Sequence, residues 1–416
     1  MSAPPLALLL TYAEARARVL QAATVLPAET VTLLSARSRA LRRRIEAPHA
    51  LPPFRNSAMD GWAVRGADLA RATGAAPVTL RVVETLPAGH VASRALAAGE
   101  AMRIMTGAMI PEGADAVVPF EDGERGHDAD GETMRTGRAP HAHQHVRDAG
   151  ADVAAGALVF EEGRELSPHD LALLASLGIA EVAVGTSPRV AVLSTGDELL
   201  EPHEALRPGT IRDSNLPMLA MLVEQAGGQV VIAERMPDDS ERVAARIGEA
   251  LAIADVVLTI GGVSAGDHDP VKQALAHHGT LELWRVAMRP GRPQASGRLG
   301  ARLFHGLPGN PASVACVFEA LVRPALRRMQ GHTQIDRPRA PVRVAVDIES
   351  AQGRTDFVRV TLEWRLGALW ATPAGAQTSG HLSPQSHAHA LLVVPADIAR
   401  LAASDEAEAL VLRLPY

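Results

Sequence analysis

RVAVLSTGDEL (189–199), DVVLTIGGVSAGDHD (255–269) and RLFHGLPGNPASV (302–314) are the segments that decide the fold. Each begins with a short run of apolar, mostly aliphatic residues and ends in a loop that contains glycine. Amphipathic stretches such as DSERVAARIGEALAIA (239–254) lie between them. Apolar strands that alternate with helices are typical of a parallel sheet covered by helices on both faces. The sequence therefore predicts a doubly wound α/β domain over residues 188–335.

Three further units are predicted around this α/β domain. Helical periodicity over residues 12–46 predicts a helix there, within a small helical and β linking or dimerisation domain made of 1–47 and 151–187. Short β-branched runs separated by Gly, Pro and Asp predict a β-rich insert domain over 48–150. Strand-like segments at short spacing predict a small barrel or sandwich over 336–416, which we assign as a C-terminal β-barrel domain. The predicted fold class is thus α/β multidomain.

Composition excludes several classes of partner. The 416 residues carry a formal charge of -6 without long runs of one sign, and only 3% of them are aromatic. We therefore expect small-molecule partners, with no nucleic acid and no membrane. The apolar run 6–10 lacks the basic flank of a signal peptide and is too short to span a membrane. The single cysteine, Cys316, cannot form an intramolecular disulfide, which indicates the reducing cytoplasm.

Acidic side chains follow several predicted strands at their carboxyl ends, where an open parallel sheet binds ligands. Clustered carboxylates repel one another unless a proton or a hard cation compensates, and Mg²⁺ held by one or two carboxylates and a phosphate is a common solution. The alternative is helix capping, since Asp239-Ser240 and Asp269-Pro270 both precede helical segments. We favour a metal and phosphate site, with capping as a partial role. The acidic residues are Asp197, Glu198, Asp238, Asp239, Asp267 and Asp269.

Groups suited to an anion lie in the same part of the chain. Gly261 and Gly262 allow backbone N–H groups to approach a ligand closely, although a Gly-Gly pair alone is a weak signal. Arg285, Arg289 and Arg292 lie within eight positions, on a strand and on a turn stiffened by prolines. Guanidinium groups match tetrahedral oxyanions, whereas solvated surface arginines are the alternative for any one of them.

Two other features lie close to these groups in the sequence. Asn310 and Pro311 begin an apolar helix directly after a predicted strand, and this turn would form a wall of the same cleft. Lys272 is the only lysine in the chain. An ammonium group suits a compact contact with a phosphate, and chance retention is the alternative.

Seven motifs, taken together and in order, resemble the molybdopterin molybdenumtransferase family, which is also called MoeA and, in animals, the gephyrin E domain. The resemblance runs from near residue 27 to the end of the chain, and seven ordered motifs are far more specific than any one of them. The motifs are NSAMDGWAV (56–64), RIMTGAMIPEGADAVV (103–118), VLSTGDEL (192–199), GTIRDSN (209–215), TIGGVSAGDHDPVK (259–272), VAMRPGRP (286–293) and GLPGNPASV (306–314).

The resemblance implies a fold, an activity and a set of partners. It implies an elongated four-domain subunit whose α/β domain is molybdopterin-binding and MogA-like, in a homodimer with loops of the partner facing that domain. The implied enzyme is a cytoplasmic molybdotransferase of molybdenum cofactor biosynthesis. It inserts molybdate into adenylyl-molybdopterin with Mg²⁺ or a similar cation and releases AMP. Contact with the adenylyltransferase of the same pathway is also expected.

Two alternatives to this activity stay open. One is a molybdopterin adenylyltransferase, because such enzymes are similar to the doubly wound domain alone. The other is a molybdopterin-binding scaffold protein, because the animal relative also clusters receptors.

The resemblance also assigns roles to residues by position. The catalytic group would be Asp60, Thr106, Asp152, Glu198, Asp238 and Asp269, of which Glu198, Asp238 and Asp269 would hold the cation. The substrate-binding group would be Asp197, Gly261, Gly262, Ser264, Lys272, Arg285, Arg289, Arg292, Pro308, Asn310, Pro311, Arg359 and Ser379. The chain departs from the family pattern with Arg289 and Arg292 where lysine is common, with Trp62 in place of tyrosine, and near His268, where an aromatic residue is common. Positive charge is kept at 289 and 292, so oxyanion binding is expected to survive.

Overall fold

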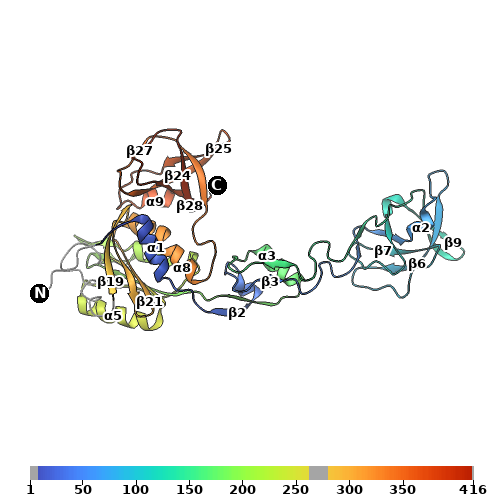
Figure 1. Cartoon of the computed structure of the whole chain (residues 1–416), viewed down its shortest axis with the longest axis horizontal. Coiled ribbons are helices and arrows are strands. Elements are labelled where there is room, and N and C mark those ends of the chain that lie inside the picture. Colours follow the sequence, from blue (N-terminus) through green and yellow to red (C-terminus); the bar gives the residue numbers. More distant parts are fainter. Residues whose placement is uncertain (1–7, 262–279, 415–416) are drawn as a thin grey trace. The chain divides into compact units, whose positions relative to one another are not determined.

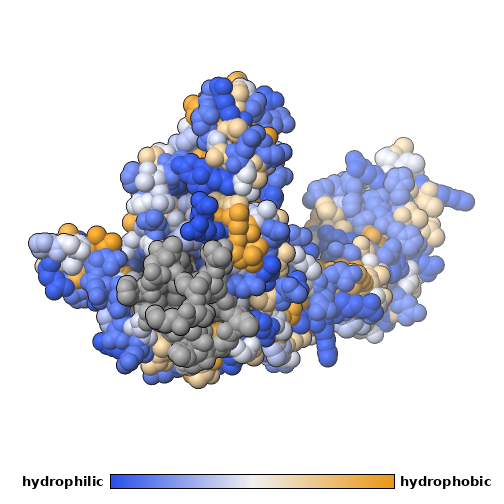
Figure 2. Space-filling view, turned by 60° about the vertical axis from the view of Figure 1, so that its left-hand side comes forward, coloured by the Kyte–Doolittle hydropathy of each residue, from blue (hydrophilic) through white to orange (hydrophobic). Residues whose placement is uncertain are grey.

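The computed structural model describes residues 8–261 and 280–414, which form two compact units. Unit 1 comprises Met1–Arg42, Gly163–Ser167 and Val182–Tyr416, and unit 2 comprises Arg43–Glu162 and Pro168–Glu181. The finer division into four domains stays a prediction. Hydrophilic residues cover most of the face in Figure 2, with apolar residues in scattered patches. Within the described ranges, no helix is both long and apolar enough to cross a lipid bilayer.

The predicted doubly wound domain lies in unit 1 (Figure 1). Its four parallel strands lie side by side in the order β17, β14, β18, β21. The chain runs from β14 to β17 on one side and then crosses to β18 on the other, so the topological switch point lies between β14 and β18. Ligands of open α/β sheets bind at such a point, beyond the carboxyl ends of the strands. The bounds are β14 Arg189–Thr195, β17 Gln229–Met236, β18 Val256–Ile260 and β21 Arg302–Leu307.

Successive side chains of a strand point to opposite faces of the sheet, and in these strands both sets are apolar. Helices therefore cover both faces. Val190 and Val192 of β14 pack into one core with α1, α4, α7 and α8, whereas Ala191 and Leu193 pack into a second core with α5. The two cores confirm the predicted doubly wound arrangement. The helix bounds are α1 Tyr12–Ala22, α4 Asn215–Gln225, α5 Ser240–Ile253, α7 Pro311–Val317 and α8 Arg323–Met329, with one π-helical turn at Phe318–Val322.

The sheet is not parallel throughout, which corrects one prediction. β20 (Pro293–Leu299) and β19 (Thr280–Arg289) continue it as an antiparallel hairpin beyond β21, and β1 (Leu8–Thr11) pairs with β19 in parallel. The sequence PQASGRL of β20 is short of β-branched residues, so its pattern did not predict a strand. The Arg289–Arg292 turn is therefore the loop of a hairpin.

The C-terminal barrel is confirmed. Its five strands pair in a closed ring, β24 with β25, β25 with β22, β22 with β28, β28 with β26, and β26 with β24. Parallel pairing of β19 with β24, in which Arg289 is opposite Asp356, joins the barrel to the α/β sheet. The bounds are β22 Arg339–Val344, β24 Thr355–Arg365, β25 Ala368–Pro373, β26 Ala390–Val394 and β28 Glu406–Val411, with α9 at Ser383–His387.

The long N-terminal helix predicted over 12–46 is wrong beyond Ala22. α1 starts with a capping box between Thr11 and Glu14, which satisfies the first free N–H groups of the helix. Pro27 keeps Leu26 out of the helical conformation, and the chain then forms β2 (Ala28–Thr32), since AETVT contains three β-branched residues. A 3₁₀ turn at Leu33–Ala36 follows.

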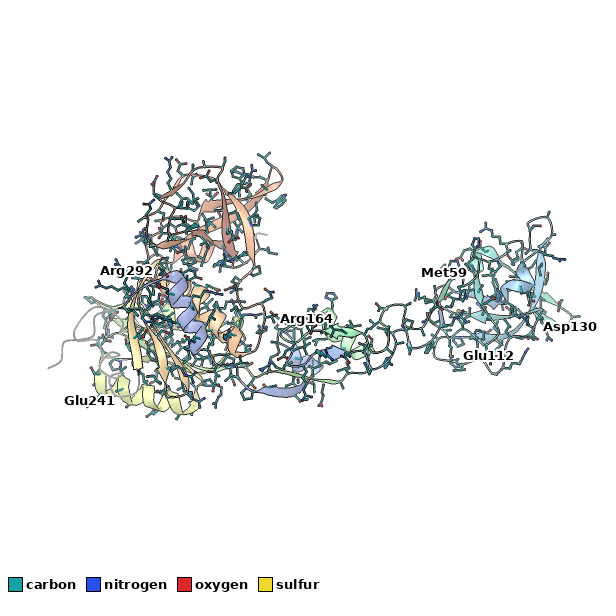
Figure 3. The ribbon with its side chains drawn as sticks, in the orientation of Figure 1. Met59, Glu112, Asp130, Arg164, Glu241 and Arg292 are labelled. Carbon is teal, nitrogen blue, oxygen red and sulfur yellow. The ribbon has the colours of Figure 1, made fainter. Side chains whose placement is uncertain are left out.

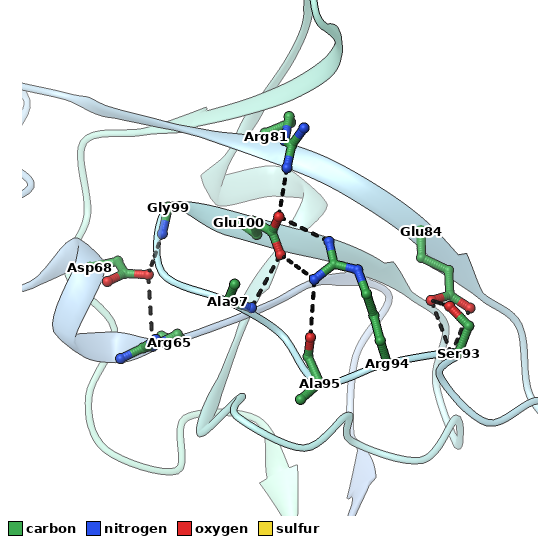
Figure 4. A network of polar contacts seen from close by, with 10 residues as sticks. All are labelled: Arg65, Asp68, Arg81, Glu84, Ser93, Arg94, Ala95, Ala97, Gly99 and Glu100. Carbon is green, nitrogen blue, oxygen red and sulfur yellow. Dashed lines mark hydrogen bonds and ion pairs between the residues drawn. The ribbon is translucent and has the colours of Figure 1, made fainter.

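Unit 2 contains a six-stranded sheet in the order β8, β5, β7, β6, β10, β9, in agreement with the predicted β-rich insert. The buried carboxylate of Glu100 on β7 accepts hydrogen bonds from Arg81 and Arg94 (Figure 4). These bonds, with a third from the N–H of Ala97, lower the pKa of Glu100 to about 2. The bounds are β5 Gly61–Val64, β6 Val78–Leu86, β7 Glu100–Ile104, β8 Ala116–Pro119, β9 Glu124–Asp128 and β10 Gly131–Thr136, with α3 at Pro168–Ser176.

Candidate functional site

The structure brings three predicted carboxylates together at the ends of β14 and β17. The N–H of Asp238 donates to the carboxylate of Asp197 at 3.1 Å. Partial burial raises the pKa of Asp238, and the nearby charges of Asp197 and Glu198 raise it further, against a backbone hydrogen bond from Asp197 that lowers it. Mutual repulsion of this kind is relieved by a proton or by a cation. The cluster is therefore suited to bind positive charge.

Helix capping accounts for one neighbour of this cluster and not for the cluster itself. The side chain of Asp239 accepts from the N–H groups of Glu241 and Arg242, both at 3.0 Å, and caps α5. Asp238 stands one residue before the cap and contacts Asp197 in the loop after β14 instead. The capping alternative thus applies to Asp239, and the role of Asp238 stays a prediction.

Gly261 lies at the switch point, directly after β18. Its φ of +82° is in the left-handed region, and a Cβ atom there would lie 3.1 Å from the carbonyl oxygen of Thr195. A side chain at 261 would be strained and crowded, so the loop after β18 requires glycine. The remaining predicted members of this loop, Gly262, Ser264, Asp269 and Lys272, lie outside the described residues and stay predictions.

A cavity of about 770 Å³ opens where the α/β sheet meets the barrel. Its walls come from the β19–β20 turn, the start of α7, the segment before β24 and the loop after β25. Figure 3 labels Arg292, which lies on the β19–β20 turn. Five predicted residues meet there, and Arg354, Gln377 and Ser313 join them although the sequence analysis missed them. The predicted members are Arg289, Arg292, Pro308, Asn310 and Ser379.

Asp356 contacts two of the arginines in the cavity wall. It is 3% exposed and accepts from Arg354 at 2.8 and 3.3 Å, and its other neighbour is the guanidinium of Arg289 at 3.7 Å. One buried carboxylate thus orients two arginines at the cavity wall. With Arg292 the wall carries three guanidinium groups against one carboxylate, a net positive charge suited to an oxyanion.

Arg359 occupies a different place from the other predicted ligands. It is 1% exposed, and its guanidinium donates to the carbonyl oxygens of Ala376, Thr378 and His381 at 3.0–3.1 Å. It is not among the residues that line the cavity. Arg359 instead shapes the loop that presents Ser379, whose carbonyl accepts from the first turn of α7.

Two more predicted residues, Pro311 and Arg285, do not line the cavity. Pro311 is the first residue of α7, and Asn310 is its N-cap residue, but the Asn310 side chain makes no capping hydrogen bond and faces the cavity instead. Arg285 is exposed on β19, opposite Pro293. By strand alternation it shares a face with Ala287 and Arg289.

In unit 2 the structure pairs Asp60 with Thr106. The carboxylate of Asp60 accepts from the backbone N–H of Thr106 at 2.6 Å and from its hydroxyl at 2.7 Å. These bonds hold the pKa of Asp60 below its usual value, so the side chain is charged at neutral pH. Asp152 is exposed on a turn, where its N–H donates to Leu51.

The side chains of the acidic cluster are compatible with a bound cation. Within residues 8–261 and 280–414, no three side chains of His, Cys, Asp or Glu are grouped as a metal site. Mg²⁺ commonly uses only one or two carboxylates and completes its shell with water and phosphate oxygens. Glu198 and Asp238 therefore fit such an ion.

Three family models match the chain in order. "MoeA N-terminal region (domain I and II)" matches residues 10–178, "Probable molybdopterin binding domain" matches 191–328, and "MoeA C-terminal region (domain IV)" matches 341–412. Together with the geometry above, they define a multidomain α/β protein with an acidic switch point and a cationic cavity. The chain belongs to the MoeA family.

Relatives extend this similarity over nearly the whole chain. Molybdopterin molybdenumtransferase 2 of Mycobacterium tuberculosis is 39% identical over 384 residues, which are 91% of this chain and 93% of the relative. Molybdopterin molybdenumtransferase of Haemophilus influenzae is 39% identical over 84% of this chain and 85% of its own length. The crystal structure of the molybdopterin biosynthesis moeA protein of Pyrococcus horikoshii OT3 matches with a TM-score of 0.82 and 29% identity, over 97% of this chain and 100% of that chain.

Proposed function

We propose that this chain is a molybdopterin molybdenumtransferase, which inserts molybdate into adenylyl-molybdopterin and releases AMP in molybdenum cofactor biosynthesis. The observation that carries the proposal is the cationic cavity, in which Arg289, Arg292 and Arg354 converge. Molybdate is a tetrahedral dianion, and forked guanidinium donors match its oxygens. Membership of the MoeA family supports the pterin as the second substrate.

The chemistry divides between two places in unit 1. In the cavity, the arginines hold molybdate while the Ser379 loop and Asn310 shape the opposite wall. At the switch point, Glu198 and Asp238 would hold a cation, which would supply Lewis-acid polarisation of the phosphate joined to AMP. A water molecule adds to the phosphorus of AMP as the phosphoanhydride bond breaks, which releases AMP. The two dithiolene thiols pass their protons to one molybdate oxygen, which leaves as water while molybdenum forms bonds to the two sulfurs.

We also propose a cytoplasmic homodimer in which Asp60 and Thr106 of one copy serve the substrate site of the other. Three exposed apolar side chains, Phe54, Met59 and Met109, lie close in sequence to this pair and suit a protein contact. Mixing two inactive variants, Asp60→Ala and Glu198→Ala, tests this proposal. Subunit exchange should restore about a quarter of the activity, because half of the dimers are mixed and each mixed dimer has one intact site.

The reaction itself is tested by molybdate-dependent AMP release. Purified protein is supplied with adenylyl-molybdopterin and Mg²⁺, with and without molybdate, and AMP is measured. We expect release only with molybdate, and a loss of at least about 100-fold in Glu198→Ala, as for removal of one preorganised electrostatic group. Formation of the adenylate from ATP and pterin without molybdate would identify an adenylyltransferase instead. If the protein binds the pterin but catalyses neither reaction, it is a molybdopterin-binding scaffold protein.

A further inference from the structure

A chain of buried polar side chains lies directly behind the arginine turn. Gln294 and Ser296 of β20 are each 1% exposed, and His305 of β21 is fully buried. Ser296 and His305 are cross-strand partners, and Gln294 lies two residues away on the same face of the sheet. The rings of Trp284 and His305 are nearly perpendicular, with centroids 6.4 Å apart. Polar groups in such a place are costly unless each finds a partner.

The hydrogen bonds run in one direction. The amide nitrogen of Gln294 donates to the carbonyl oxygen of Gly291 at 2.6 Å, so its amide oxygen is the atom that faces His305. That oxygen lies 3.2 Å from Nε2 of His305, which must therefore carry the ring proton. Nδ1 then accepts from the hydroxyl of Ser296 at 3.1 Å.

Burial keeps this direction fixed. It lowers the pKa of His305 to about 4, so the ring is neutral across the physiological range. A neutral ring with both nitrogens engaged has one tautomer and one orientation.

The end of the chain is the turn that carries two of the cavity arginines. Gly291 lies between Arg289 and Arg292 with a φ of +109°, and a Cβ atom there would come within 2.4 Å of the Val317 side chain of α7. The turn is thus pressed against α7 on one side, and its carbonyl is held by Gln294 on the other. A backbone hydrogen bond from Val286 N–H to Arg292 C=O at 2.8 Å closes the hairpin.

We propose that Gln294, oriented by His305, is a positioning residue that fixes the Arg289–Arg292 turn in the conformation that binds the oxyanion. The proposal rests on the proposed function, since it concerns the same cavity. Filling the space behind the hairpin would not require polar groups, and apolar side chains would fill it at lower cost in desolvation. The polar chain adds a fixed contact to one carbonyl of the turn, and preorganised contacts of this kind raise affinity by reducing the ordering that binding requires.

The test compares Gln294→Met with a matched control, Gln330→Met. Gln330 is also 1% exposed in unit 1 and also donates to backbone carbonyls, those of Ala226 and Leu326. Neither of these two residues lines the cavity, whereas Gly291, the acceptor of Gln294, does. Molybdate binding to the full chain is measured by calorimetry, beside thermal stability. Both variants should lose similar stability, whereas only Gln294→Met should raise the molybdate Kd, by about fivefold, the factor that corresponds to one hydrogen bond. Equal Kd values for the two variants would overturn the proposal.

A measurement on the unchanged protein covers the case in which Gln294→Met does not fold. Nitrogen-15 spectra of the labelled histidine rings, with His305 assigned from a His305→Phe variant, should show the neutral Nε2–H form of His305 at pH 7. An Nδ1–H tautomer or a charged ring would overturn the proposal. Absence of molybdate binding in the unchanged protein would count against the proposed function, and the ring tautomer would still decide whether the hydrogen-bond chain exists.

Discussion

Replacement of Arg289 by alanine separates the binding role of the cavity from its structural role. The Arg289 side chain is 48% exposed, and its guanidinium lies 3.7 Å from the carboxylate of Asp356. Asp356 keeps its two shorter contacts with Arg354 when Arg289 is removed. Arg289→Ala therefore removes a donor from the cavity and leaves the buried carboxylate paired.

The two expected magnitudes differ enough to be told apart. A half-exposed ion pair contributes at most about 1 kcal/mol to stability. A hydrogen bond to a charged ligand contributes about 1.5–3 kcal/mol, which corresponds to a roughly 10- to 150-fold change in affinity. We therefore expect the molybdate Kd to rise by at least about tenfold, with a small change in the free energy of unfolding.

Arg289→Lys is the matched control, since it keeps the charge and loses only the fork. Molybdate titrations of AMP release and direct calorimetry give KM and Kd, and urea denaturation gives stability. The lysine variant should lie between the alanine variant and the unchanged protein. A Kd within twofold of the unchanged value for Arg289→Ala would refute the reasoning, whatever the effect on stability.

Four further perturbations have defined outcomes. Asp238→Asn should relieve repulsion in the acidic cluster, so the protein should be at least as stable in melting experiments while the Mg²⁺ concentration for half-maximal AMP release rises about tenfold or more, the effect of one lost charged ligand. Glu100→Gln should destabilise unit 2 at pH 7 and no longer at pH 2. The lowered pKa of Glu100 gives the folded state stability that is complete above about pH 4.5 and is lost as the pH falls toward about 2. Equal loss of stability at both pH values, measured by circular dichroism, would contradict this. Arg359→Met should lower the free energy of unfolding by about 3 kcal/mol, because three loop carbonyls lose their donor. A change below about 1 kcal/mol, measured by urea denaturation, would refute the structural role of Arg359. Asp60→Asn should reduce AMP release with a melting temperature near that of the unchanged protein, because the pair with Thr106 is exposed, and a large loss of melting temperature would show a structural role instead.

Periodicity made much of the fold predictable. The segments VAVL (190–193) and VVL (256–258) are apolar at every position because both faces of the sheet are covered, and this pattern distinguishes them from half-exposed strands. β20 escaped prediction because Gln294 and Ser296 are polar residues in a buried strand. Their burial depends on partners that no local pattern contains.

The candidate site was predictable where it follows strand ends. Asp197, Glu198 and Asp238 come directly after β14 and β17, so the parallel sheet brings them together. Arg354 and Asp356 were missed because they reach the cavity through the pairing of β19 with β24, two strands far apart in the sequence. Their only local sign is the turn AQGR (351–354) at the start of β24, TDFVRVTLEWR. Arg359 resembled a ligand in sequence, whereas the structure places its guanidinium under a loop.

The central claim is that the cavity at the junction of sheet and barrel holds the oxyanion. Crystals of the full chain soaked in molybdate or tungstate, measured at an absorption edge of the metal, locate that ion directly. We predict an anomalous peak in the cavity, with oxyanion oxygens at hydrogen-bond distance from Arg289, Arg292 or Arg354. A peak elsewhere on the protein, with the cavity free of metal, would contradict the claim.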